Sequence, residues 1–132
     1  MNFKNVLVYK TFLGQKYGYR PLPVRITDTE FRMLCDVSTG EDVELLRKWY
    51  WLDTNSIPDT FILMKYSTYY TNFLNQAEKK LMEEDRKLAF RTMNQLVVIL
   101  RKASKKLLEQ RRFSHDDNHR YNFSGMIITI II

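Results

Sequence analysis

The sequence predicts a mixed α/β segment at residues 1–66, a mainly α-helical segment at residues 67–112, and a polar loop with an apolar tail at residues 113–132. Three observations lead to this prediction. An apolar, strand-like run precedes the first glycine, two helix-start patterns follow it, and a long stretch without glycine or proline comes later in the chain.

Composition bounds the class of protein before any motif is considered. The 132 residues suit one domain or part of one, and the 45% hydrophobic and 27% charged content is ordinary for a globular protein. The single cysteine, Cys35, excludes an intrachain disulfide and favours a reducing compartment, so we expect a cytoplasmic protein. We expect no transmembrane segment, because no stretch approaches the roughly 20 apolar residues that cross a bilayer. We expect no secretory signal, because MNFKNVLVYKTFLG has lysines inside its apolar run and no small-residue cleavage site.

Residues 5–13, NVLVYKTFL, form a nearly continuous apolar run. This pattern predicts a strand buried on both faces, as in a parallel sheet covered by helices. The GQKYG that follows lacks the third glycine and the Lys-Ser/Thr pair of a phosphate-binding loop. We therefore interpret the following segment as a structural turn that ends the strand, formed around Gly14, Gly18, Pro21 and Pro23.

Two helix starts follow this turn. Thr27 and Glu30 have the spacing of a capping box, in which the hydroxyl and the carboxylate each satisfy a free backbone N–H. Ser38 and Glu41 repeat the spacing and predict a second helix over EDVELLRKWYWL, residues 41–52. DTNSIPD ends that helix, and TFILMKY after it predicts another short buried strand.

Residues 83–110 contain neither glycine nor proline and predict a long helix, which we expect to form a helical pair with the part of the chain that precedes it. Its apolar residues recur at three- and four-residue spacing, at Phe90, Met93, Val97, Leu100, Leu107 and Leu108. Val98 and Ile99 lie outside this stripe, so we expect the helix to contact two partners.

The net charge of +6 comes from one segment, because residues 78–112 contain 11 Lys and Arg against 5 Asp and Glu. Candidate contacts for a protein partner or for phosphate groups fall on one helix face, at Lys87, Arg91, Lys102 and Lys105. The segment lacks the interleaved aromatic residues of a single-strand platform, so we favour a solvated face. A small basic nucleic-acid-binding protein using the 78–112 helix is the alternative, and an acidic membrane surface is a further one.

Other chemical motifs are weak. His115 and His119 in HDDNH stand four residues apart, as metal ligands on a helix do, but Asp116, Asp117 and Asn118 favour a turn, and we predict a solvated loop. Cys35 falls on an apolar helix face, which predicts a core thiol rather than a nucleophile. We therefore expect no catalytic residue, no cofactor and no metal.

Several stretches together resemble one family. FLGQKYGYRPLPVRI, EFRMLCDV, ELLRKWYWLDTNSIPDTFIL, LMEEDRKLAF, VILRKASKKL and NHRYNFS are similar, in this order, to consecutive pieces of the NACHT and WD repeat domain-containing proteins. LLRKWYWLDTNSIP is the most specific of them. The resemblance implies that residues 1–66 are the C-terminal part of a TIR-like α/β domain, and that residues 67–112 are a basic helical connector toward the NACHT domain.

The resemblance further implies a non-catalytic fragment of a signalling or scaffold protein of the STAND NTPase family, acting in protein–protein contact and interdomain coupling. Its partners would be proteins or neighbouring domains. No Walker motif is present, so no nucleotide-contacting residue of the family can be assigned. An enzyme related to NAD-cleaving TIR domains would need a carboxylate site, and none is recognisable. The tail GMIITIII, residues 125–132, departs from the family pattern, and we expect it to be non-native.

Overall fold

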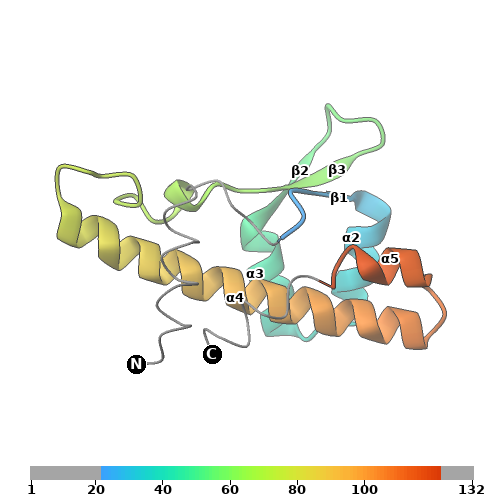
Figure 1. Cartoon of the computed structure of the whole chain (residues 1–132). Coiled ribbons are helices and arrows are strands. Elements are labelled where there is room, and N and C mark those ends of the chain that lie inside the picture. The colour runs from blue at the N-terminus through green and yellow to red at the C-terminus, as the bar shows by residue number, and fades with distance from the viewer. Residues whose placement is uncertain (1–21, 123–132) are drawn as a thin grey trace, which may run out of the picture.

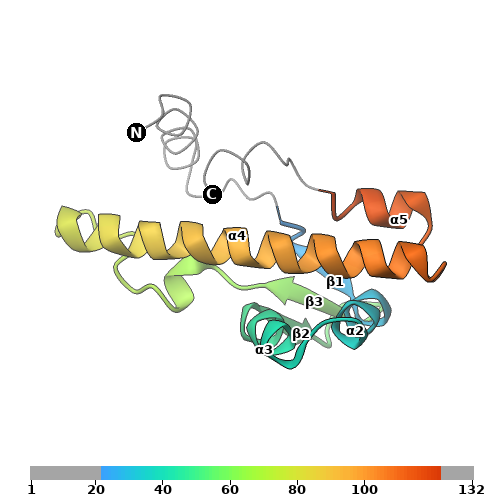
Figure 2. The ribbon, with the colours of Figure 1, turned by 90° about the horizontal axis from the view of Figure 1, so that it is seen from below.

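A computed structural model describes residues 22–122 of the chain. The elements follow in the order β1 (Arg25–Thr27), α2 (Asp28–Asp36), α3 (Gly40–Trp49), β2 (Tyr50–Asp53), β3 (Thr60–Leu63), η1 (Tyr66–Thr68), α4 (Lys79–Glu109) and α5 (His115–His119). The long helix α4 is the central element, and the other elements lie along it (Figure 1). Figure 2 shows α2, α3 and the strands on one side of α4 and α5 on the other.

The three described strands form one antiparallel sheet in the order β1-β3-β2. Arg25 of β1 pairs with Ile62, and Tyr50 of β2 pairs with Leu63. The expected mixed α/β class and the strand in TFILMKY are confirmed, whereas the expected parallel sheet is wrong for these strands. The short connection between β2 and β3 permits only antiparallel pairing. The strand predicted at residues 5–13 lies outside the described residues.

The two predicted helix starts differ in accuracy. Thr27 caps α2, and its hydroxyl accepts the N–H of Glu30 at 3.4 Å. The second cap is Thr39, one residue after the predicted Ser38. The Ser38 hydroxyl instead donates to the carbonyl of Leu34 at 2.7 Å, so it serves the end of α2. Sequence spacing alone does not show which of the two adjacent hydroxyl residues caps α3 and which one bonds to the end of α2.

The second helix is shorter than the sequence predicts. It was expected to continue through Leu52, but α3 ends at Trp49 and the chain enters β2 at Tyr50. The carbonyl of Trp49 accepts the N–H of Met64 at 2.7 Å, and the Tyr50 hydroxyl donates to the carbonyl of Pro23 at 2.9 Å. These tertiary bonds stabilise an extended backbone at a sequence that is also suited to a helix.

The turn predicted around the glycines and prolines is described only in part. Pro23 lies just before β1 and accepts the hydrogen bond from Tyr50. Gly14, Gly18 and Pro21 lie outside the described residues. The turn as a whole therefore stays a prediction.

The helix α4 contains 31 residues, of which 13 are buried. This is a wider arc than the predicted stripe, of which only Leu108 is not buried. The expected helical pair is wrong, because η1 and a series of turns precede α4 in place of a second long helix. Although α4 is long, neither it nor another helix of the described part is apolar enough over that length to cross a membrane.

An aromatic cluster joins α3 to the segment that follows the sheet. Trp49 is 1% exposed, and the centroid of its ring lies 5.7 Å from that of Tyr66, 4.8 Å from Tyr69 and 5.8 Å from Tyr70. Tyr66 in turn contacts Phe73 at 5.6 Å. Tilted and edge-on contacts of this kind stabilise beyond the area that they bury. Residues on both sides of position 66 thus share one hydrophobic core.

Two side chains at the start of α4 hold the turns that precede it. Asp85 accepts the backbone N–H of Asn72 at 2.7 Å. The buried Arg86 donates from Nε to the carbonyl of Phe73 at 3.0 Å and lies 5.4 Å from the centroid of the Phe73 ring. A charged side chain at a buried helix position is thereby used to fix a loop rather than to meet solvent.

We expect Trp49→Ala to lower the free energy of unfolding by about 3–5 kcal/mol, because it removes a fully buried ring and leaves a cavity. Trp51→Ala is the matched control, because Trp51 is 50% exposed, and it should cost about 1 kcal/mol or less. Urea unfolding followed by circular dichroism measures both. Equal losses from the two variants would contradict a core centred on Trp49.

Candidate interaction surface

A groove of about 850 Å³ lies between the first turns of α3 and the middle of α4. Glu41 and Asp42 line it from α3, and Lys87 and Arg91 line it from α4. The two walls therefore carry opposite charge. Within residues 22–122 no ion pair joins the two walls, because the ion pairs found in this part of the chain involve residues that do not line the groove.

Local helix rules place these charges. Glu41 and Asp42 occupy the first turn of α3, where carboxylates complement the positive end of the helix dipole. Lys87 and Arg91 stand four residues apart on α4 and so project from the same face of that helix. The packing of α3 against α4 then brings the two pairs to opposite sides of one groove.

The floor of the groove is apolar. Phe90 and Ile99 are buried, Leu45 is half-buried against the core, and Val98 is 44% exposed. Val98 and Ile99 are the residues that fell outside the predicted stripe of this helix. Both residues line the groove, where Ile99 is buried and Val98 is partly exposed.

Asn94 is the buried polar residue of this groove. It is 8% exposed, and its Oδ1 atom has no hydrogen-bond partner among the described residues. Leaving a buried amide oxygen unpaired costs roughly 1–3 kcal/mol of stability. No sequence pattern marks Asn94 as a groove residue. Glu41 and Asp42 are recognisable from the sequence only as first-turn residues of a helix, not as residues of a groove.

The structure divides the four predicted basic contacts into two pairs. Lys87 and Arg91 line the groove, whereas Lys102 and Lys105 are exposed and do not line it. Arg91 and Lys102 are separated by about 16 Å along α4 at 1.5 Å per residue. Their role as contacts stays a prediction.

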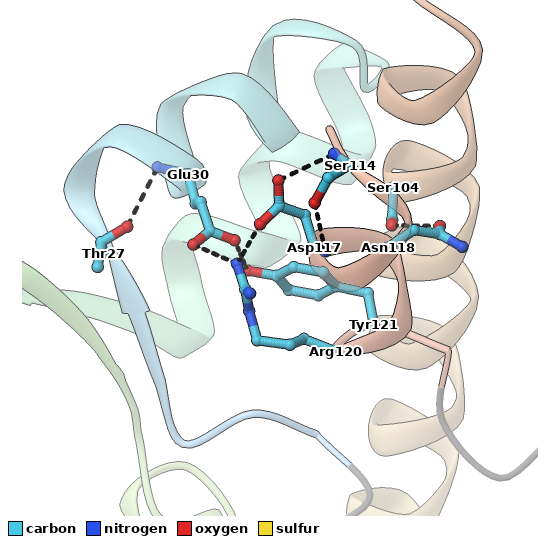
Figure 3. A network of polar contacts seen from close by, with 8 residues as sticks. All are labelled: Thr27, Glu30, Ser104, Ser114, Asp117, Asn118, Arg120 and Tyr121. Atoms are coloured by element: carbon cyan, nitrogen blue, oxygen red, sulfur yellow. Dashed lines mark hydrogen bonds and ion pairs between the residues drawn. The ribbon is translucent and has the colours of Figure 1, made fainter. Parts of the chain in front are cut away.

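A polar network fixes α5 against α2 (Figure 3). The Glu30 carboxylate accepts from Arg120 Nη2 at 2.7 Å and from the Tyr121 hydroxyl at 3.0 Å. Arg120 also donates to Asp117 at 3.0 Å. The carboxylate predicted to complete a local capping box is thus used for a contact 90 residues away in the sequence. A second bond, from Ser104 to Asn118 at 2.7 Å, ties α5 to α4.

The segment expected to be a solvated loop forms α5. Ser114 caps it in a complete capping box, with the Asp117 N–H donating to the Ser114 hydroxyl at 3.1 Å and the Ser114 N–H donating to the Asp117 carboxylate at 2.9 Å. This reciprocal cap offsets the weak helix propensity of HDDNH. His115 and His119 are exposed, and within residues 22–122 no group of three or more metal-ligating side chains was found.

The network shifts the pKa values of its members. The hydrogen bond to Glu30 raises the pKa of Arg120, and the hydrogen bonds from Ser114 lower the pKa of Asp117. Burial, followed by the charge of Glu30, raises the pKa of Tyr121 far above its usual value of 10.0. The charged forms of Arg120 and Asp117 and the neutral form of Tyr121 are therefore the ones that the fold stabilises.

Cys35 is half-buried, and burial raises the pKa of its thiol. The thiolate, which is the nucleophilic form, is therefore disfavoured at neutral pH.

Comparison with known proteins finds relatives in two organisms. Human NACHT and WD repeat domain-containing protein 2 is 29% identical to the chain over 116 residues, and the mouse protein of the same name is 28% identical over 116 residues. Each match covers 86% of this chain and 7% of the relative. No family model and no solved structure matches the chain.

The resemblance to NACHT and WD repeat domain-containing proteins is confirmed by these matches. The chain is a homologue of these proteins over most of its sequence and spans about 7% of the length of the curated relatives.

We expect Tyr121→Phe to lower the free energy of unfolding by about 1 kcal/mol at neutral pH, because the hydrogen bond to Glu30 is lost. The folded-state pKa of Tyr121 is raised, so its contribution is complete below pH 10.0 and is lost as the pH rises further, where the unfolded chain releases the proton first. Urea unfolding at about pH 8 and about pH 11 should show the difference between wild type and variant shrink and then reverse. A difference that is constant with pH would contradict this account.

We expect Asn94→Leu to raise the free energy of unfolding by about 1 kcal/mol, because it removes a buried oxygen that nothing in the described chain pairs with. Asn118→Leu is the matched control. Its Oδ1 accepts from the buried Ser104 hydroxyl, so the same change there should destabilise by roughly 1–2 kcal/mol. Thermal and urea unfolding measure both, and destabilisation by Asn94→Leu would show that its amide is satisfied.

Proposed function

We propose that the chain is a non-catalytic segment of a cytoplasmic NACHT and WD repeat signalling or scaffold protein, acting in protein–protein contact and interdomain coupling. One observation supports this above the others. The chain is homologous over 86% of its length to a 7% portion of proteins whose name states two further kinds of domain. A segment of this size within such proteins has neighbouring domains as its nearest partners.

The assignment of residues 67–112 to a basic connector is part of this proposal. Its support is the 31-residue α4, which carries the basic charge and extends along the whole described body. The TIR-like origin of residues 1–66 rests on the resemblance of the sequence, since the described strands are antiparallel.

The chemistry of the groove favours contact over catalysis. Its floor is formed by side chains such as Leu45 and Val98, which offer apolar area and no reactive atom. An apolar surface rimmed by charged residues is typical of a protein-contact site. The thiol of Cys35, the chain's strongest potential nucleophile, is held in its protonated form by burial.

The charge distribution disfavours the nucleic-acid alternative. Lys87 and Arg91 face the same groove as Glu41 and Asp42, whose carboxylates repel phosphate. Only Lys102 and Lys105 of the four candidate contacts stand clear of these carboxylates. A phosphate backbone would therefore meet a face of mixed sign.

We expect the immobilised chain to bind a recombinant segment of the human relative taken from either side of the matched region, with saturable micromolar affinity in biolayer interferometry. Duplex DNA and ATP are the comparison analytes, and we expect neither to bind at physiological salt. Binding to neighbouring domains is weak when each partner is separate, because the covalent link normally supplies a high effective concentration.

The outcomes separate the alternatives. DNA binding that falls steeply with salt, together with no binding of either segment, would replace this function by nucleic-acid binding. Saturable ATP binding that is lost in Lys16→Ala would show that the glycine-containing turn is a phosphate site and would overturn the non-catalytic assignment.

A further inference from the structure

We propose that the α3–α4 groove receives an amphipathic helix of a partner segment, whose apolar stripe is flanked by basic residues along one edge and acidic residues along the other. This inference rests on the proposed function and names the surface through which contact is made. Its occupant is defined by chemistry: one helix, one stripe, and two edges of opposite charge.

The apolar floor of the groove favours a partner helix with an apolar stripe. Val98 is 44% exposed, and Leu45 and Phe90 are further apolar side chains that line the groove. Burial of such side chains is the main favourable term in association. A helix that lies in a groove presents apolar residues at three- and four-residue spacing to the floor of that groove.

The charged walls of the groove favour a partner helix whose two edges carry opposite charge. A helix with acidic residues on both edges would meet repulsion from Glu41 and Asp42, and one with basic residues on both edges would meet repulsion from Lys87 and Arg91. Only a helix with one edge of each sign meets attraction at both walls. Repulsive contacts of this kind set specificity as strongly as attractive ones.

Asn94 supplies a polar anchor on the floor. Its Oδ1 has no partner in the described chain, although the residue is more than nine-tenths buried. Rotation of the carboxamide exchanges Oδ1 and the NH2 group, so a hydroxyl or amide in the stripe of the occupant can pair with either one. Asn94 is therefore the buried polar side chain of the lining at which an occupant can form a hydrogen bond once the carboxamide has rotated toward it.

Three synthetic peptides of about five helical turns, roughly 18 residues, test the charge pattern. They share one leucine and alanine stripe, and their edges carry lysine and glutamate, lysine on both sides, or glutamate on both sides. We expect the wild-type chain to bind the mixed-edge peptide about tenfold more tightly than either of the others, as measured by fluorescence anisotropy at low salt. The preference should shrink as salt is added.

The double variant Lys87→Glu with Arg91→Glu makes both walls acidic. The preference should then move to the peptide with lysine on both edges. The matched control is Lys102→Glu with Lys105→Glu, which changes the same net charge outside the groove and should keep the mixed-edge preference. An equal shift in both double variants would show that net charge, not the groove, attracts the peptides.

Val98→Arg blocks the floor and should abolish binding of all three peptides. Leu81→Arg is its control, since Leu81 is a similarly exposed residue of α4, at 42% against 44%, that does not line the groove. Circular dichroism establishes that both variants remain folded. Unchanged peptide binding by Val98→Arg would overturn the groove as the docking site.

The same pair of variants separates this inference from the proposed function. If a segment of the human relative binds wild type and Val98→Arg equally, the chain makes protein contacts through another surface and the groove proposal fails alone. If that segment loses affinity for Val98→Arg and keeps it for Leu81→Arg, both proposals are supported.

Discussion

The burial of α4 on two sides is the constraint on which the rest of the structure depends. Thirteen of its 31 residues are buried. The α2–α3–sheet layer covers one side and α5 covers another (Figure 2). A helix of this length gains most of its stability from such packing rather than from propensity. The helices α2, α3 and α5 pack directly on α4, and the short strands pack on α2 and α3, so these elements and the residues next to them form one core.

The groove is a consequence of this arrangement. The aromatic contacts of Trp49 fix the C-terminal end of α3 to the segment that precedes α4. The first turn of α3, with Glu41 and Asp42, is left beside the exposed Lys87 and Arg91. Acidic residues at a helix start and basic residues four apart each follow a local rule. Only the tertiary packing of α3 and α4 brings these acidic and basic residues to the two sides of one apolar floor, so that the groove has one acidic and one basic wall.

The network around Glu30 shows how a local pattern is redirected by the fold. The Thr27 hydroxyl performs the cap that the spacing predicts, but the Glu30 carboxylate turns to Arg120 and Tyr121 (Figure 3). An ion pair with a guanidinium and a hydrogen bond from a buried phenol together outweigh one backbone N–H. The charge of Glu30 therefore holds α5 to α2, and the covering of α4 depends on a residue whose sequence context indicates only a helix start.

The sequence by itself determined the mixed α/β class, the start of α2 at Thr27, the strand at Thr60–Leu63 and the long helix, because these features depend on local spacing, which a linear pattern records. The sequence also determined the resemblance of the chain to NACHT and WD repeat domain-containing proteins. Only the tertiary structure decided that Tyr50 leaves the helix for a strand, that the described sheet is antiparallel, and that HDDNH forms a capped helix. For Tyr50, hydrogen bonds with partners distant in sequence override a local helical preference, and spacing along one chain cannot show which distant partner will be present. The helix at HDDNH depends on the local cap of Ser114 and Asp117 and on the bond from Ser104 of α4 to Asn118.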